Sequence, residues 1–92
     1  MSEVQLYTKT YCGYSKRAKA LLAARGIPYD DVDVTSEGHE FEEMSDRSGG
    51  ETTVPQVFIS GRHVGGYTEL KALDDQGELE PLRAASGSEA AH

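Results

Sequence analysis

Apolar positions in the first third of the chain follow two successive periods. Residues 3–8 alternate in character from one position to the next, which predicts a short strand. From Tyr14 to Arg25 the apolar residues instead recur every three or four positions, as they do on one face of a helix. Gly26 is a natural helix terminator, and Pro28 prevents the helix from continuing. The start of the chain is therefore predicted to be a strand followed by a helix.

The same two periods continue to the end of the chain. The elements predicted from them are a strand over 29–35, a helix over 36–48, a strand over 54–59, a short strand around Val64, and helices over 68–76 and 78–84. The apolar run at 57–59 indicates a strand that is buried on both faces. Residues 85–92 show no periodicity and are predicted to form a disordered C-terminal tail.

The order of these elements predicts the fold class. A strand–helix–strand unit implies parallel pairing with a right-handed crossover, and the later hairpin adds antiparallel strands. The expected architecture is an α/β domain over residues 1–84, with a four-stranded mixed sheet flanked by helices on both faces.

Composition then excludes several classes of function. The chain has 92 residues, one cysteine and a net charge of −7, so an internal disulfide framework or a zinc site of several thiolates is ruled out. The acidic balance argues against binding to nucleic acid, because Lys and Arg must neutralise phosphates there. There is no apolar run long enough for a transmembrane helix, so no membrane association is expected. There is also no secretory signal, so a cytoplasmic location is expected. The three histidines are scattered, and metal binding through them is not expected.

The single cysteine falls at the junction between the first predicted strand and the first predicted helix. At that place Cys12 faces the unpaired N–H groups of the helix and the positive end of its dipole, and both stabilise a thiolate. Further positive charge near the thiol can come from Lys9, Lys16 or Arg17. Such a setting favours a reactive nucleophile, while the alternative is a buried thiol that acts as a small apolar side chain.

Three motifs resemble the glutaredoxin family in their order and spacing. They are Thr10-Tyr11-Cys12-Gly13-Tyr14-Ser15, Thr53-Val54-Pro55-Gln56 and Gly65-Gly66, and the similarity covers about residues 3–84. The resemblance implies a thioredoxin fold that binds glutathione and exchanges it with glutathionylated proteins or small disulfides. It also implies an oxidoreductase, a thiol transferase that acts as a monomer and takes part in redox homeostasis.

Position 15 departs from the dithiol members of that family, which carry a second cysteine there. Without it, Cys12 cannot close an intramolecular disulfide, but it can still attack the glutathionyl sulfur of a mixed disulfide. A second glutathione must then reduce the intermediate, which makes the expected cycle monothiol. Ser15 is compatible with a monothiol member, with a Cys-to-Ser variant of a dithiol one, and with a residue that merely supports the first helical turn.

The resemblance also implies where glutathione binds. One part of the implied site is a loop formed by Thr53, Val54 and Pro55. In the family, the proline of this loop is cis, and the residue before it pairs with the cysteinyl backbone of the ligand. Gly66, Tyr67 and Thr68 correspond to the turn that holds its γ-glutamyl end. The alternative for this turn is a plain helix cap with Thr68 as the N-cap residue.

Two further positions complete the implied site. Lys9 matches the lysine that meets the glycyl carboxylate and the thiolate. Tyr14 matches the aromatic residue beside the thiol, although it could instead be the first apolar residue of the helical stripe. Many family members have an acidic residue at position 68, and here Glu69 is the candidate to meet the ligand's ammonium in place of Thr68. Arg47 is left out of the site, because a charge that closes a helix explains it equally well.

A second function class is compatible with the motifs. Two monothiol chains can hold a [2Fe–2S] cluster as a homodimer if each supplies Cys12 and one bound glutathione. The family members with this role carry Cys-Gly-Phe-Ser and an insertion before the cysteine, and this chain has Cys-Gly-Tyr-Ser and no insertion. These differences favour the catalytic function, although Gly13 keeps the cluster hypothesis open. A third hypothesis, a protein that binds partners without chemistry, is the weakest.

Overall fold

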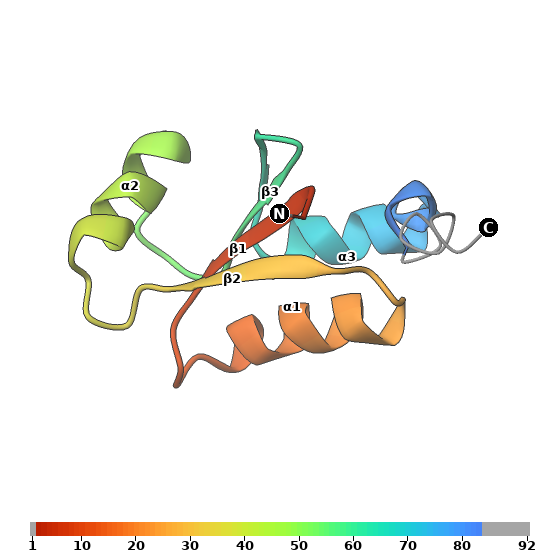
Figure 1. Cartoon of the computed structure of the whole chain (residues 1–92), viewed down its shortest axis with the longest axis horizontal. Coiled ribbons are helices and arrows are strands. Elements are labelled where there is room, and N and C mark those ends of the chain that lie inside the picture. The colour runs from red at the N-terminus through yellow and green to blue at the C-terminus, as the bar shows by residue number, and fades with distance from the viewer. Residues whose placement is uncertain (1, 84–92) are drawn as a thin grey trace.

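The computed structural model describes residues 2–83 and shows strands and helices in nearly the predicted order (Figure 1). The elements are β1 (Val4–Thr8), α1 (Gly13–Ala24), β2 (Tyr29–Asp33), α2 (His39–Arg47), β3 (Gln56–Ile59), β4 (Arg62–Gly65), α3 (Tyr67–Asp75) and the 3₁₀ turn η1 (Glu80–Leu82). In the described part of the chain, no helix combines the length and the apolar character needed to span a membrane. The predicted tail over 85–92 lies outside the described residues, and so does the predicted end of the domain at residue 84.

The strands form one mixed sheet in the order β2-β1-β3-β4. Strand β1 pairs in parallel with β2, with Val4 opposite Tyr29, and antiparallel with β3, with Val4 opposite Ile59. Strands β3 and β4 form the antiparallel hairpin. The predicted four-stranded mixed sheet is therefore confirmed, and β1 lies inside it with its carboxyl end leading directly into Lys9 and Cys12.

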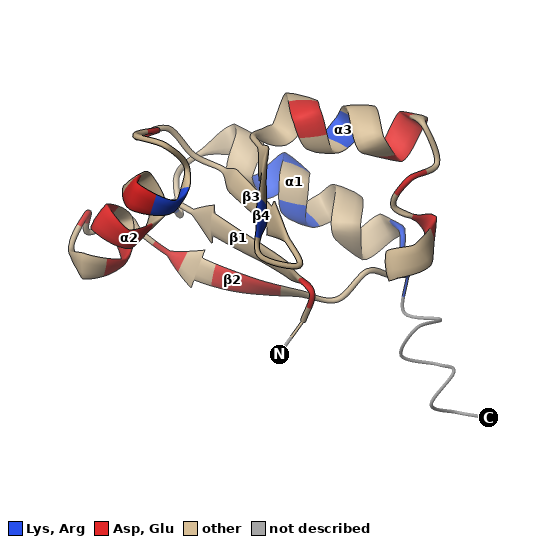
Figure 2. Cartoon of the chain, turned by 90° about the horizontal axis from the view of Figure 1, so that it is seen from above, with Lys and Arg blue, Asp and Glu red and all other residues tan. Residues whose placement is uncertain are grey.

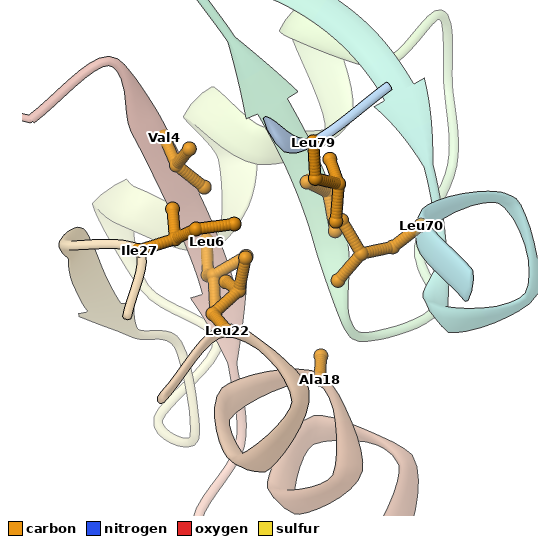
Figure 3. Packing of buried hydrophobic residues seen from close by; sticks show 8 residues of the cluster. Val4, Leu6, Ala18, Leu22, Ile27, Leu70 and Leu79 are labelled. Carbon is orange, nitrogen blue, oxygen red and sulfur yellow. The ribbon is translucent and has the colours of Figure 1, made fainter. Parts of the chain in front are cut away.

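The two faces of the sheet bury two separate apolar clusters. Helices α1 and α3 cover one face, and Figure 3 shows side chains of β1, α1, α3 and the segment after α3 converging there. Helix α2 covers the other face, where Tyr7, Val34, Met44 and Phe58 pack together. Because side chains alternate along β1, Leu6 enters the first cluster and Tyr7 the second. The prediction of helices on both faces is confirmed.

The final predicted helix is wrong within the described residues. In place of a helix over 78–84, the chain forms only one 3₁₀ turn, Glu80–Leu82. Leu79 just before it is buried in the α1–α3 cluster. Pro81 cannot donate a backbone hydrogen bond, so the segment ends as a short turn held by the burial of Leu79.

The third strand is also shorter than predicted. Pairing begins at Gln56, and Val54 lies before the strand, because Pro55 between them has no N–H to give to a ladder. The apolar run at 57–59 is buried as expected, apart from partial exposure of Ile59. The consequence for the site is that Val54 belongs to a loop beside Cys12, where its backbone is open to other partners.

Candidate active site

Cys12 is the N-cap residue of α1, as the junction between strand and helix predicts. The turn that carries it is closed by the Cys12 N–H, which donates to the Lys9 carbonyl at 3.2 Å. The Lys16 N–H in turn donates to the Cys12 carbonyl at 3.1 Å, which makes the first bond of the helix. The half-buried thiol donates to the Val54 carbonyl at 3.6 Å. The helix start thus presents the sulfur to the loop that precedes Pro55.

Opposing influences act on the pKa of the Cys12 thiol. Partial burial is the largest single influence, and it raises the pKa because it disfavours the charged form. Hydrogen bonds from the backbone N–H and hydroxyl of Ser15 and from the backbone N–H of Tyr14, together with the charge of Lys9, lower it. Their sum prevails, so the pKa of Cys12 lies below its ordinary value. A larger fraction of the sulfur is therefore a thiolate at neutral pH, which is the nucleophilic form.

Ser15 is part of this thiol environment and is fully buried. Its hydroxyl oxygen accepts the Lys9 backbone N–H at 3.4 Å and also supports the thiolate of Cys12. The reading in which Ser15 merely helps the first helical turn is therefore incomplete. Ser15 occupies the position of the second cysteine in dithiol members, and its hydroxyl donates to the Cys12 sulfur.

Tyr14 is not the first residue of the buried stripe of α1. Its side chain is 57% exposed, and the buried positions of the helix are Ser15, Ala18 and Leu22. The helix is turned so that Ser15 faces inward, which directs Tyr14 outward beside Tyr67, with 6.0 Å between the ring centroids. This arrangement excludes Tyr14 as the first apolar residue of the helical stripe, and its role beside the thiol stays a prediction.

Most of the predicted ligand residues line one cavity of about 150 Å³ next to Cys12. Its walls come from α1, from the loop before β3 and from the start of α3, and the lining residues are Tyr14, Thr53, Val54, Pro55, Gly66, Tyr67, Thr68 and Glu69. The Val54–Pro55 peptide bond is cis, as the resemblance implies. Segments separated by about forty residues in the sequence therefore meet where the sequence motifs predict a binding site.

The loop before Pro55 is held by a residue that the sequence analysis did not assign to the site. The buried Gln56 donates from its side-chain amide to the Thr53 carbonyl at 2.9 Å and lies 3.2 Å from the Thr53 hydroxyl. Its carbonyl oxygen lies 2.6 Å from Nε2 of His63 on β4. This chain of contacts fixes Thr53 and Val54 against the sheet. Only its place next to the Thr-Val-Pro motif could have indicated a role for Gln56.

The turn into α3 differs from the predicted cap. Gly66 is the N-cap residue, and Thr68 lies inside the first turn of α3, so Thr68 does not cap the helix. The Gly66 N–H donates to Oε1 of Glu69 at 2.8 Å, so the glutamate three residues into the turn satisfies the backbone donor of the N-cap residue. Gly65 has a φ of +130°, a backbone conformation that favours glycine. Glu69 borders the cavity, so its carboxylate remains near the position predicted for the ligand's ammonium.

Lys9 lies outside the lining of this cavity and already has a partner. Its side chain is 10% exposed, with the ammonium 5.1 Å from the centroid of the Phe41 ring. The ammonium forms an ion pair with Glu37, whose hydrogen bond raises the pKa of Lys9. The sequence analysis missed Glu37, because nothing in the local pattern links two residues 28 positions apart.

Arg47 contacts the sheet and is not among the residues that line the cavity. Its guanidinium donates to Oε1 of Gln5 at 2.6 Å and to the Tyr7 hydroxyl at 2.7 Å, and it stacks 4.2 Å from the centroid of the Phe58 ring. These contacts connect α2 to the sheet. Within residues 2–83, no group of three or more His, Cys, Asp or Glu side chains is placed to hold a metal ion.

Comparisons with known proteins agree with this geometry. A family profile described as Glutaredoxin matches residues 4–64. Glutaredoxin 3 of Escherichia coli K12 is 46% identical over 82 residues, which cover 89% of this chain and 98% of that protein. A monothiol glutaredoxin of Caenorhabditis elegans is 47% identical over 85 residues, which cover 87% of this chain and 57% of that protein.

A solved structure extends the likeness to three dimensions. The buckwheat glutaredoxin–glutathione complex superposes with a TM-score of 0.75 at 29% identity, covering 92% of this chain and 79% of that one. The sheet order, the cysteine at the start of α1 and the cis proline thus occur in a chain that is similar to glutaredoxins in both sequence and structure. The chain belongs to the glutaredoxin family, whose members have the thioredoxin fold and a glutathione-dependent redox function.

Proposed function

We propose that this chain reduces glutathione mixed disulfides by a monothiol mechanism with Cys12 as the nucleophile. The observation that carries the proposal is the environment of Cys12, a half-buried thiol of lowered pKa beside the cavity lined by Tyr14, Val54 and Tyr67. Ser15 supports the thiolate but offers no second sulfur. The similarity to a monothiol glutaredoxin supports a cycle that uses one thiol.

The cycle has two thiol–disulfide exchanges. The Cys12 thiolate attacks the glutathionyl sulfur of a mixed disulfide, a Cys12–glutathione disulfide forms, and the substrate leaves as a thiolate that takes a proton from solvent. The thiolate of a second glutathione then attacks the glutathionyl sulfur on Cys12. Glutathione disulfide is released and the Cys12 thiolate is restored. The net reaction consumes one free glutathione: its sulfur is oxidised to the disulfide level in glutathione disulfide, and the substrate sulfur is reduced to a thiol.

We propose that the cavity beside Cys12 binds the glutathionyl group. Its cysteinyl unit would lie against the Val54 backbone, its γ-glutamyl end at the start of α3 near Gly66 and Thr68, and its glycyl carboxylate toward Lys9. The N-terminus of a helix favours an anionic group, because its backbone N–H groups point outward. The related buckwheat complex with glutathione supports this choice of ligand.

The mechanism is tested by steady-state kinetics with a glutathionylated peptide and glutathione. Parallel lines in double-reciprocal plots are expected, since the enzyme passes through one covalent intermediate. The matched variant Cys12→Ser keeps the shape of the side chain and should have no activity above background. Turnover by Cys12→Ser would contradict the assignment of the nucleophile, and intersecting lines would contradict the covalent cycle.

A [2Fe–2S] cluster carrier is the second candidate. The observation that favours it is the open surface around the thiol: Tyr11 is 70% exposed, and no atom lies within 4 Å of the Cβ that a side chain at Gly13 would add. One chain supplies only Cys12 of the four thiolates, so two chains and two glutathione molecules are required. Anaerobic incubation with iron, sulfide and glutathione tests this. A visible charge-transfer spectrum from a dimer would support it, and a colourless monomer would exclude it.

We propose a monomer that acts on glutathionylated proteins or small disulfides, and a dimer only if a cluster is bound. The cytoplasm is the proposed location, because the cycle needs a pool of reduced glutathione. Gel filtration of the reduced protein tests the proposed oligomeric state. A dimer in the absence of any cluster would contradict it.

A further inference from the structure

The ion pair between Lys9 and Glu37 occupies the position at which a substrate carboxylate is expected. Lys9 follows β1, and its ammonium lies 5.1 Å from the Phe41 ring centroid and 5.9 Å from that of Tyr11. The stem of the lysine is buried, with 10% of the side chain exposed, whereas the Glu37 side chain is 53% exposed. The cation is therefore held in place, and its carboxylate partner faces solvent.

The loop that carries Glu37 is tied to the segment that carries Lys9. The Val34 N–H donates to the Thr8 carbonyl at 2.8 Å, and the Thr10 N–H donates to the Thr35 hydroxyl oxygen at 3.0 Å. The Glu37 N–H closes a turn onto the Val34 carbonyl at 2.9 Å. These bonds bring the glutamate side chain to the ammonium and make the pair a property of the fold.

The backbone of Glu37 is in an uncommon conformation for its residue type. Its φ is +56°, in the left-handed region that glycine adopts without cost. A glycine at position 37 would suit the turn better, so the backbone gives no reason for a glutamate there. Within residues 2–83, the Glu37 side chain forms its ion pair with Lys9.

We propose that Glu37 is a specificity-determining residue that occupies Lys9 in the free protein and is displaced by the carboxylate of an incoming glutathionyl group. The inference rests on the proposed function, in which that group binds beside Cys12 with its glycyl end toward Lys9. A ligand without a carboxylate at that end leaves the ion pair intact. Glu37 therefore lowers the affinity of the site for the full tripeptide.

The physical basis is an exchange between two carboxylates on one fixed cation. The Lys9 side chain is 10% exposed and its ammonium lies against the Phe41 and Tyr11 rings, so a ligand carboxylate meets the cation at that place. Glu37 can withdraw, because more than half of its side chain is already in solvent, where a free carboxylate is well hydrated. The free energy gained when a glycyl carboxylate binds Lys9 is then only the difference between the free energies of the two ion pairs.

Single-turnover transfer tests the proposal. The glutathionyl group of a labelled peptide is passed to Cys12 at increasing peptide concentrations, which gives a half-saturating concentration and a limiting rate. For Glu37→Gln we expect the half-saturating concentration to fall about three- to tenfold, as removal of a competing, partly exposed ion pair predicts. With a peptide whose glutathione is esterified at the glycyl carboxylate, wild type and Glu37→Gln should differ by less than about twofold.

The matched control is Glu43→Gln, which removes the same charge from an exposed position on α2 and should behave as wild type with both peptides. Glu37→Gly removes the carboxylate and suits the backbone of the turn, so it should repeat the result of Glu37→Gln. Equal half-saturating concentrations for Glu37→Gln and Glu43→Gln would overturn the inference while leaving the proposed function intact. An equal effect on the esterified peptide would also overturn it. Failure of the wild type to accept the glutathionyl group would overturn the proposed function itself.

Discussion

The hydroxyl of Ser15 stabilises the thiolate form of Cys12. It lies fully buried in the first turn of α1 and hydrogen-bonds to the sulfur, which helps to hold the pKa of Cys12 below its ordinary value against the effect of burial. The reactivity of the thiol is thus a local property of residues 9–15. A substitution at position 15 can remove this donor or add a second sulfur.

Ser15→Ala should raise the pKa of Cys12. The hydroxyl stabilises the thiolate and not the thiol, so its loss moves the equilibrium toward the protonated form and slows reactions near neutral pH. The rate of alkylation by iodoacetamide, followed against pH, measures this. Ser48→Ala is the matched control, since it removes a buried hydroxyl that donates to the Ser45 and Glu51 carbonyls and not to the thiol. An unchanged pH profile for Ser15→Ala would contradict the role of the hydroxyl.

Ser15→Cys should restore dithiol chemistry. The side chain at position 15 already contacts the sulfur of Cys12, so a second thiol there can close a disulfide with modest adjustment. We expect the variant to reduce a plain protein disulfide at a rate at least about tenfold above that of wild type. The release of protein thiols, measured over time, reports this activity. Equal rates for the two proteins would show that the comparison with dithiol members is wrong.

At the scale of elements, the hydrophobic pattern predicted most of the fold because most elements obey a local period. The strand at 4–8 and the helix that ends before Gly26 follow directly from alternation, helical spacing and a glycine with a φ of +71°. The helix predicted over 78–84 failed because helical spacing of Leu79 and Leu82 does not exclude a shorter segment that buries Leu79.

The site was predicted as far as sequence motifs describe it. Cys12, Pro55 and Gly66 lie in recognisable motifs, and the structure brings their segments together. Contacts between side chains that are far apart in the sequence are not described by these motifs. The ion pair of Lys9 with Glu37 depends on how the loop after β2 folds back on β1, and no local pattern encodes that path.

The junction between β4 and α3 depends on the backbone conformation of Gly65. Gly65→Ala should destabilise the fold by about 1–3 kcal/mol, because an alanine resists a φ of +130° and its Cβ would lie 2.8 Å from Cγ of Glu69. Displacement of Glu69 would also remove the acceptor of the Gly66 N–H. Chemical denaturation of the variant measures the free energy of unfolding.

Gly13→Ala is the matched control for this substitution. Position 13 is the first residue of α1, it is not among the residues of positive φ, and nothing lies within 4 Å of an added Cβ. Alanine is the better helix former, so this variant should be as stable as wild type or slightly more stable. If Gly65→Ala were equally stable, the account of the turn would be wrong.

Charge is unevenly distributed over the whole molecule. Asp and Glu residues gather on β2 and α2, and Lys and Arg residues lie on α1 near its start (Figure 2). In a chain of net charge −7, an anionic substrate is repelled at long range, so fixed cations near the thiol have a larger influence on its binding. This makes the occupancy of Lys9 by Glu37 relevant to the whole protein's affinity for glutathione.

Low pH should weaken the ion pair that links the end of α1 to α3. Arg25 donates twice to Asp74, at 2.7 and 2.9 Å, and these hydrogen bonds lower the pKa of Asp74. A carboxylate with a depressed pKa in the folded state contributes stability above its unfolded pKa of about 4, and that contribution is lost as the pH falls through the folded value. Thermal unfolding should therefore separate wild type from Asp74→Asn at pH 7 and bring them together in strong acid.

Asp46→Asn is the control for this pH dependence, because Asp46 is exposed on α2. It should unfold at nearly the same temperature as wild type at both pH values. If Asp74→Asn showed the same deficit in strong acid as at pH 7, the ion pair could not be its cause.

We propose that one thiol is enough for the reaction because glutathione supplies the other. The most direct test is the intact mass of the protein after incubation with glutathione disulfide. We predict a mass increase of one glutathionyl group per chain, located on Cys12, reversed by added glutathione and absent in Cys12→Ser. An unmodified mass at a pH where the thiolate predominates, or conversion to a Cys12–Cys12 dimer with no glutathionyl adduct, would contradict the account.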